Sequence, residues 1–314
     1  MTHTPDQTPD TKAGLVHVSL NDGWTVRAVA GPIPSHVVGI DLPATVPGCV
    51  HLDLLAAGVI PDPYLDANEV AVSWIGRVDW RFETSFTWDG TAHEEIDLVA
   101  LGLDTVATVE LNGTVVAHTQ NMHRSYRLPV AGLLQPGRNA LAITFAAGLT
   151  AAESRSAELG PRPHVNTHPF NAIRKMACNY GWDWGPDLVT AGIWRPISLE
   201  SWQTARIAAV RPLTDVDGSH GRLRTCVDIQ RAPGADGPLT LEVQVAGSAV
   251  KTTVAAGATT AVAEISVTDV ALWWPHGYGG QPLYPVKVAL SSAAGHLDRW
   301  EGRVGFRTIE MPRR

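Results

Sequence analysis

The chain has 314 residues, of which 45% are hydrophobic and 18% charged, a balance typical of a globular protein with a buried core. Its length fits two domains better than one. The net charge of −7 and the lack of a basic patch in the sequence argue against nucleic acid or an anionic membrane as a partner.

The cysteines and the N-terminal segment further restrict the class of protein and its expected location. Cys49, Cys178 and Cys226 are widely spaced and odd in number, so neither a disulfide framework nor a structural zinc site is expected. Residues 1–11 lack the cationic start and apolar stretch of a signal peptide, and no apolar run is long enough to span a bilayer. The sequence therefore predicts a cytoplasmic location, with residues 1–14 as a disordered tail.

Short segments rich in β-branched and aromatic residues begin at Leu15 and alternate with turn residues. Residues 80–86 alternate apolar and polar, which predicts a strand with one buried face. Asn112 and Gly113 predict a type I′ hairpin. Helices are expected at 50–57 and 146–159, and further strands at 24–29, 78–88, 96–101, 105–111 and 139–145.

The character of the sequence changes near residues 201–211, after which the segments are plainer and rich in Ala, Val, Thr and Gly. About seven short strands over about 100 residues are typical of an immunoglobulin-like sandwich. No stretch alternates strand and helix as a parallel barrel does. The prediction is an all-β chain of two domains, 15–203 and 204–310, followed by linker residues 311–314. The expected strands of the second domain lie at 224–230, 239–246, 251–254, 260–267, 286–290 and 298–306.

The segment 178–186 carries the strongest candidate site, because Asp183 stands there between Trp182 and Trp184. An indole can stack on a sugar ring, and a carboxylate can accept two hydrogen bonds from neighbouring hydroxyls. Gly181 and the Gly-Pro pair at 185–186 predict a shaped loop around them. Two interpretations stand at this point. The triplet contacts a carbohydrate, or both indoles are buried in a β-sandwich corner where Asp183 accepts backbone hydrogen bonds.

Other chemistry has weaker support in the sequence. Glu69 follows Asn68 in a polar loop, where a solvated or capping role is favoured over that of a glycosidase acid. Two histidine pairs, 118 with 123 and 164 with 168, lack the context of a metal motif. The aromatic segment 273–279 suggests a second sugar platform, but its Pro and Gly residues favour a packed corner between domains.

Several segments together resemble glycoside hydrolase family 2, and within it the β-mannosidases. They run in family order over about residues 20–310: 46–51, 54–55, 60–64, 102–107, 111–113, 174–175, 181–186, 192–196, 273–284 and 305–309. The Leu-Asn-Gly and Trp-Trp-Pro segments are shared broadly within family 2. The Trp-Asp-Trp-Gly-Pro run at 182–186 is the part that points to β-mannosidases.

The resemblance implies a jelly-roll, galactose-binding-like β-sandwich followed by an immunoglobulin-like β-sandwich. It also implies a retaining exo-hydrolase of terminal non-reducing β-D-mannose, which needs no metal or organic cofactor. In such enzymes a (β/α)₈ barrel follows and carries both catalytic glutamates, and the Trp-Asp-Trp loop contacts the terminal sugar. Carried over, Trp182, Asp183 and Trp184 are the substrate-binding residues.

The sequence departs from the family pattern after Gly305, Phe306 and Arg307, because it ends at Arg314, before any barrel. The acid/base and nucleophilic glutamates have no counterparts, so no catalytic residue is assigned and the chain alone is expected to be inactive. The leading hypothesis is the N-terminal, non-catalytic portion of a β-mannosidase-like enzyme. Its partners would be a β-mannoside glycan and a catalytic barrel in cis or in trans. The alternatives are a stand-alone carbohydrate-binding module and an inactive remnant.

Overall fold

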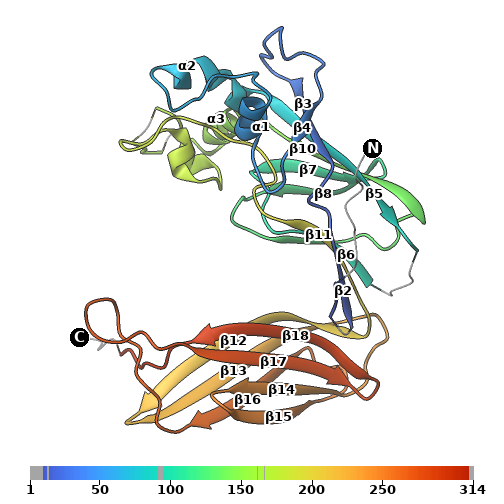
Figure 1. The fold of residues 1–314 in the computed structure, drawn as a ribbon, viewed down its shortest axis with the longest axis vertical. Helices are drawn as coiled ribbons and strands as arrows, with labels where there is room; N and C mark the ends of the chain where they lie inside the picture. Colours follow the sequence, from blue (N-terminus) through green and yellow to red (C-terminus); the bar gives the residue numbers. More distant parts are fainter. Residues whose placement is uncertain (1–9, 13, 91–94, 161, 166, 311–314) are drawn as a thin grey trace. The chain divides into compact units, whose positions relative to one another are not determined.

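A computed structural model of the protein describes residues 10–12, 14–90, 95–160, 162–165 and 167–310 (Figure 1). Among these, unit 1 comprises the residues from 17 to 90 and from 96 to 200, and unit 2 comprises 10–12, 14–16, 95 and 201–310. Most of the predicted disordered tail lies outside the described residues, but Asp10–Lys12 form strand β1. The predicted linker 311–314 lies outside them entirely. The domain boundary at 203/204 stays a prediction.

Two β-sheets contribute strands to unit 1. The six-stranded sheet has the order β4-β3-β5-β10-β7-β8, and all of its strand pairs are antiparallel. Its strands are β3 (Trp24–Ala30), β4 (Leu42–Ala44), β5 (Asp79–Trp88), β7 (Val106–Leu111), β8 (Thr114–Gln120) and β10 (Gly137–Phe145). The five-stranded sheet, β1-β2-β11-β6-β9, consists of β1, β2 (Leu15–Ser19), β6 (Glu95–Ala100), β9 (Tyr126–Pro129) and β11 (Ile197–Trp202).

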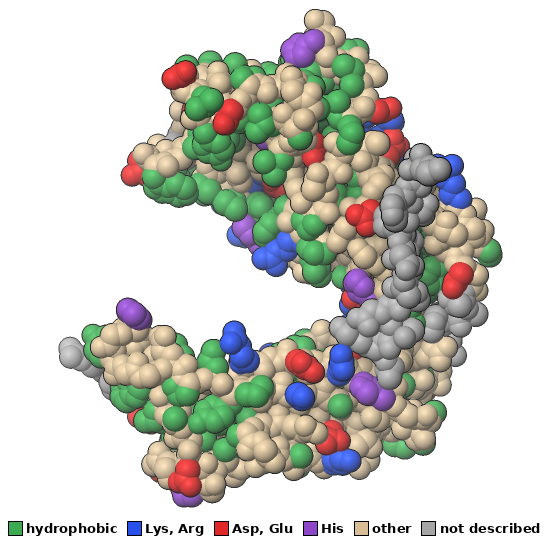
Figure 2. All heavy atoms as spheres, in the orientation of Figure 1, with side chains coloured by type: hydrophobic (Ala, Val, Ile, Leu, Met, Phe, Trp, Pro, Cys, Tyr) green, Lys and Arg blue, Asp and Glu red, His purple; other side chains and the backbone are tan. Residues whose placement is uncertain are grey.

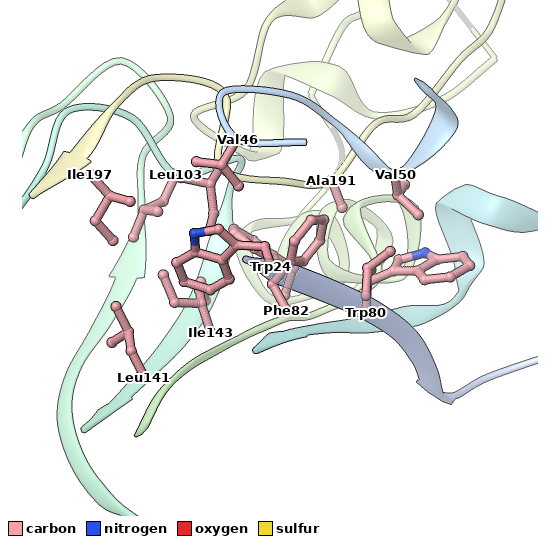
Figure 3. Packing of buried hydrophobic residues seen from close by; sticks show 14 of the residues in the cluster. Trp24, Val46, Val50, Trp80, Phe82, Leu103, Leu141, Ile143, Ala191 and Ile197 are labelled. Carbon is pink, nitrogen blue, oxygen red and sulfur yellow. The ribbon is translucent and has the colours of Figure 1, made fainter. Parts of the chain in front are cut away.

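Alternating side chains give the six-stranded sheet one buried face. Strand β5 buries every second residue, as its sequence predicts. Phe82 of β5 and Phe145 of β10 meet edge to face with ring centroids 5.5 Å apart, within a core that also holds Trp24 and Trp80 (Figure 3). The hairpin between β7 and β8 is confirmed, with φ of 51° at Asn112 and 78° at Gly113.

The helices of unit 1 lie in the connections between its strands (Figure 1). Helix α1 (Val50–Ala56) and helix α3 (Gly148–Leu159) confirm the two predicted helices. Helix α2 (Asn68–Val72) and the 3₁₀ helix η1 (Ser73–Arg77) correct the prediction of a polar loop there. Two more 3₁₀ turns are η2 (Phe170–Ala172) and η3 (Ala177–Tyr180). No helix within the described residues is long and apolar enough to cross a membrane.

Unit 2 confirms the immunoglobulin-like prediction, since its seven main strands form a three-stranded sheet, β12-β13-β16, and a four-stranded sheet, β15-β14-β17-β18. All of the neighbouring strands are antiparallel. Side chains of both sheets, such as Leu223, Val243 and Val288, meet in one core. The strands are β12 (Ala205–Asp217), β13 (His220–Arg231), β14 (Leu239–Val245), β15 (Ser248–Val254), β16 (Thr260–Val267), β17 (Tyr284–Ser292) and β18 (Gly295–Val304).

Candidate functional site

The Trp-Asp-Trp triplet forms a tight turn in unit 1, directly after η3. The backbone N–H of Trp182 donates to the carbonyl oxygen of Gly185 at 3.0 Å, and the N–H of Gly185 donates to that of Trp182 at 3.2 Å. Asp183 and Trp184 therefore occupy the tip of a two-residue loop. Gly181 precedes the turn with a φ of 82°, a backbone conformation that glycine adopts without strain. The shaped loop predicted from the sequence is confirmed.

All three side chains of the turn are exposed in unit 1. Trp182 exposes 39% of its surface and Trp184 72%, and Asp183 is exposed as well. The Trp182 ring packs edge to face on Phe170, with centroids 6.0 Å apart. A corner with two buried indoles is therefore excluded within unit 1. One indole is anchored by Phe170 and the other lies largely in solvent.

The Asp183 carboxylate has no hydrogen bond or ion pair with any described residue of the chain. Its oxygens therefore remain available as acceptors, and two vicinal hydroxyls can occupy them. Hydrogen bonds to a charged acceptor are stronger than those between neutral groups. With an exposed indole on either side, the turn combines a hydroxyl acceptor with apolar faces, which is the chemistry that a sugar ring requires.

The segments on both sides of the turn are fixed by buried contacts. Tyr180 is 2% exposed and its hydroxyl donates to the carbonyl oxygen of Gly148 at 3.1 Å. After the turn, Asp187 pairs with His168, whose Nε2 lies 2.8 Å from Oδ2 of the carboxylate. His168 and Phe170 thus hold both ends of the turn from one neighbouring segment. Sequence reasoning missed this support because it considered His168 only as a metal ligand.

A buried ion pair joins two segments that the family resemblance had singled out separately. Lys175 Nζ donates to Asp104 Oδ1 at 2.6 Å and to Thr190 Oγ1 at 2.9 Å, and both charged side chains are almost fully buried. The Thr190 hydroxyl in turn donates to Asp104 Oδ2 at 2.7 Å, and Thr105 also donates to Asp104. Burial lowers the pKa of Lys175, while the charge of Asp104 and the hydrogen bonds to it oppose that shift.

This cluster of Asp104, Lys175 and Thr190 fixes the chain before and after the turn. Backbone hydrogen bonds join the same two segments. The N–H of Asp104 donates to the carbonyl oxygen of Gly192 at 2.9 Å, and the N–H of Gly192 donates to the carbonyl oxygen of Asp104 at 3.2 Å. In the sequence Asp104 is the single charged residue of segment 102–107, whereas Lys175 follows another cation, Arg174, so neither residue marks a buried pair. The distance of 71 residues between Asp104 and Lys175 hid their pairing.

Helix α1 carries two buried titratable groups with shifts of opposite sign. Burial lowers the pKa of His51 to about 4, and the positive charge of Lys175 contributes to the shift. Burial raises the pKa of Asp53 to about 6 although one oxygen accepts a hydrogen bond from the backbone N–H of Thr45 at 2.9 Å. Its Oδ2 is buried without a protein partner among the described residues.

The Asp53→Asn variant is expected to gain stability over the wild type as the pH rises from about 4 to about 6. In that range the folded protein holds a proton on Asp53 that the unfolded chain has lost, so raising the pH destabilises the wild type. The expected change is about 2 kcal/mol. Melting temperatures of both proteins between pH 4 and pH 7.5 measure it. A difference that stays constant over this range would contradict the raised pKa.

The remaining candidates from the sequence lie at separate places in the structure. Glu69 lies in the first turn of α2, a position that suits a helix-terminal carboxylate. His118 Nδ1 contacts the Thr108 hydroxyl at 3.1 Å. Among the described residues no group of three or more His, Cys, Asp or Glu is placed to hold a metal. In unit 2, Trp274 is 37% exposed, with the Arg307 guanidinium 4.6 Å from its ring centroid.

Comparison with known families identifies both units. Residues 24–195 match the family described as the glycosyl hydrolase 2 galactose-binding domain-like family, and residues 205–307 match glycosyl hydrolases family 2. The chain belongs to glycosyl hydrolase family 2. Its two β-sandwiches are thus the galactose-binding-like and immunoglobulin-like domains of that family, as the resemblance implied.

Relatives in the family point to β-mannosidases. The chain is 33% identical to β-mannosidase B of Thermothelomyces thermophilus, over 96% of this chain and 35% of the relative. A β-D-mannosidase of Dictyoglomus thermophilum has a similar structure, with a TM-score of 0.85 and 29% identity over 94% of this chain and 36% of that one. An exo-chitosanase of Amycolatopsis orientalis shares the fold at a TM-score of 0.69 and 20% identity, over 94% of this chain and 34% of that chain.

The chain spans about a third of the length of these relatives. It is homologous to the N-terminal portion of β-mannosidase B and contains no region that corresponds to a catalytic barrel.

Proposed function

We propose that this chain is the non-catalytic, N-terminal portion of a β-mannosidase-like glycoside hydrolase and that its Trp-Asp-Trp turn contacts the substrate. In this proposal Trp182 and Trp184 supply apolar faces and Asp183 accepts hydrogen bonds from sugar hydroxyls. The substrate class is a glycan with a terminal non-reducing β-D-mannose. The protein partner is a (β/α)₈ barrel, supplied in cis or in trans, that carries the catalytic glutamates.

One observation carries this proposal. An acidic side chain with no protein partner among the described residues stands at a turn tip between two exposed indoles. A structural role would satisfy the carboxylate or bury the indoles, and unit 1 does neither. The names of the relatives support mannose as the sugar, because the β-mannosidase B enzymes are about 30–33% identical to the chain over most of its length.

The same geometry supports a contact role and not a catalytic one. Retaining glycosidases use two carboxyl groups about 5–5.5 Å apart, one as acid/base and the other as nucleophile. Within the turn Asp183 is the single carboxylate, and Asp187 beyond it is engaged by His168. Neither acid/base nor nucleophilic catalysis can therefore be assigned to the turn.

The purified chain is expected to release no p-nitrophenol from p-nitrophenyl β-D-mannopyranoside above the rate in buffer, because the turn lacks a carboxylate pair. A full-length β-mannosidase assayed in parallel is the positive control for substrate and conditions. Activity that co-elutes with the chain through two different chromatographic steps would overturn the non-catalytic assignment. It would also require an Asp or Glu within this chain to act as nucleophile.

A further inference from the structure

A hollow in unit 1, of about 910 Å³, concentrates positive charge. It lies between the end of β8, the residues that follow it, the C-terminal half of α3 and the segment around η2. Four arginines line it, namely Arg124, Arg155, Arg162 and Arg174, whereas Glu158 is the single carboxylate among its described lining residues. The whole chain carries a net charge of −7, so this arginine groove differs in sign from the protein around it.

Main-chain and ring contacts fix the floor of the arginine groove. Asn121 and Arg174 form a parallel β-bridge, and the N–H of Met122 donates to the carbonyl oxygen of Arg174 at 3.0 Å. The next residue is Lys175, whose burial with Asp104 fixes the backbone at this point. Arg124 places its guanidinium 5.8 Å from the centroid of the Tyr126 ring. The groove therefore has a defined shape despite its loop origin.

Most of the positive charge in the groove has no ion-pair partner among the residues that the structure describes. Arg155 pairs with Glu158 at 2.6 Å, one turn further along α3. Arg124, Arg162 and Arg174 are exposed, and none of the three pairs with a carboxylate among the described residues. A guanidinium presents two parallel N–H donors that match the oxygens of a carboxylate or phosphate. Three such groups around one hollow supply the paired N–H donors that an oxyanion can accept from.

The rest of the lining suits a polyhydroxylated molecule. Asn121, Asn171 and Gln120 contribute amide groups, and Tyr126 contributes an aromatic ring. The volume lies in the range of small-molecule sites, about 300–1,000 Å³. We propose that the arginine groove binds an acidic saccharide, with the guanidinium groups holding its carboxylate or phosphate and the amides its hydroxyls. The groove contains no residue of the Trp-Asp-Trp turn, so this inference is independent of the proposed function.

Calorimetric titration with four probes at low ionic strength tests the proposal. The probes are trigalacturonate, mannose 6-phosphate, neutral D-mannose and inorganic phosphate. One of the two acidic sugars should bind at least about tenfold more tightly than mannose, and its affinity should fall as salt is added. The two acidic probes distinguish a carboxylate ligand from a phosphate ligand. No binding of either acidic sugar would overturn the proposal, and so would equal binding of mannose 6-phosphate and inorganic phosphate.

Variants locate the binding. A variant that combines Arg162→Gln and Arg174→Gln should have an affinity for the acidic sugar that is lower by about tenfold or more, because each replacement removes a charge-assisted contact. Arg138→Gln is the matched control, because Arg138 is exposed in the same unit and lies outside the groove. It should leave the affinity within about twofold. The control removes one charge and the double variant two. A control that loses about half as much binding free energy as the double variant would therefore show that net charge, not the groove, attracts the ligand. Unchanged melting temperatures confirm that the variants fold.

Discussion

The Lys175→Met variant is expected to lose about 3–5 kcal/mol of the stability of unit 1, because it leaves the Asp104 carboxylate buried without its counter-charge. The three N–H donors of Lys175 all find acceptors on Asp104 and Thr190, and Met can replace none of them. For a domain of this size the loss corresponds to a fall of about 10 °C in melting temperature. Differential scanning calorimetry measures it on the transition of unit 1.

Arg174→Met is the matched control for this prediction, since it makes the same replacement of a cation at the adjacent, exposed position. It should change the melting temperature by less than about 2 °C. Equal melting temperatures for the two variants would contradict the role assigned to the buried pair. Because Lys175 lies in the segment that leads into the Trp-Asp-Trp turn, its variant should also weaken any sugar contact there.

Local patterns in the sequence were sufficient to predict most of the strands. The alternation in β5 and the Asn-Gly pair between β7 and β8 each determine structure within a few residues. Helix α2 was not predicted because it lacks such local signals. It has only five residues and its N-cap, Ala67, makes no side-chain capping hydrogen bond, so neither a long apolar period nor a capping residue marks it.

The parts of the site that depend on distant residues could not be predicted. Asp104 and Lys175 lie far apart in the chain, and only the fold brings them within hydrogen-bonding distance. The arginine groove collects four cations from positions 124 to 174, and no basic run in the sequence marks it. In contrast, Trp182, Asp183 and Trp184 are consecutive, and the glycine on either side of them was enough to predict a shaped loop. The exposure of the two indoles came only from the structure.

The Asp183→Ala variant is expected to lose the contact between the turn and a β-mannoside. Hydrogen bonds to a charged acceptor contribute about 1.5–3 kcal/mol, so affinity should fall by about tenfold or more. The wild type itself should bind only weakly, with a dissociation constant in the millimolar range or above, because the turn supplies one side of a pocket. Asp236→Ala is the matched control, since Asp236 is an exposed carboxylate in a loop of unit 2.

The most direct measurement follows the indole N–H signals of the eleven tryptophans while methyl β-D-mannopyranoside is added to the ¹⁵N-labelled chain. Trp182→Phe and Trp184→Phe assign the two signals of the turn. These two signals are predicted to shift most in the wild type and in Asp236→Ala, and to lose most of that shift in Asp183→Ala. Signals that do not move at about 100 mM sugar, well above a millimolar dissociation constant, or that move equally in Asp183→Ala, would contradict a sugar contact at this turn.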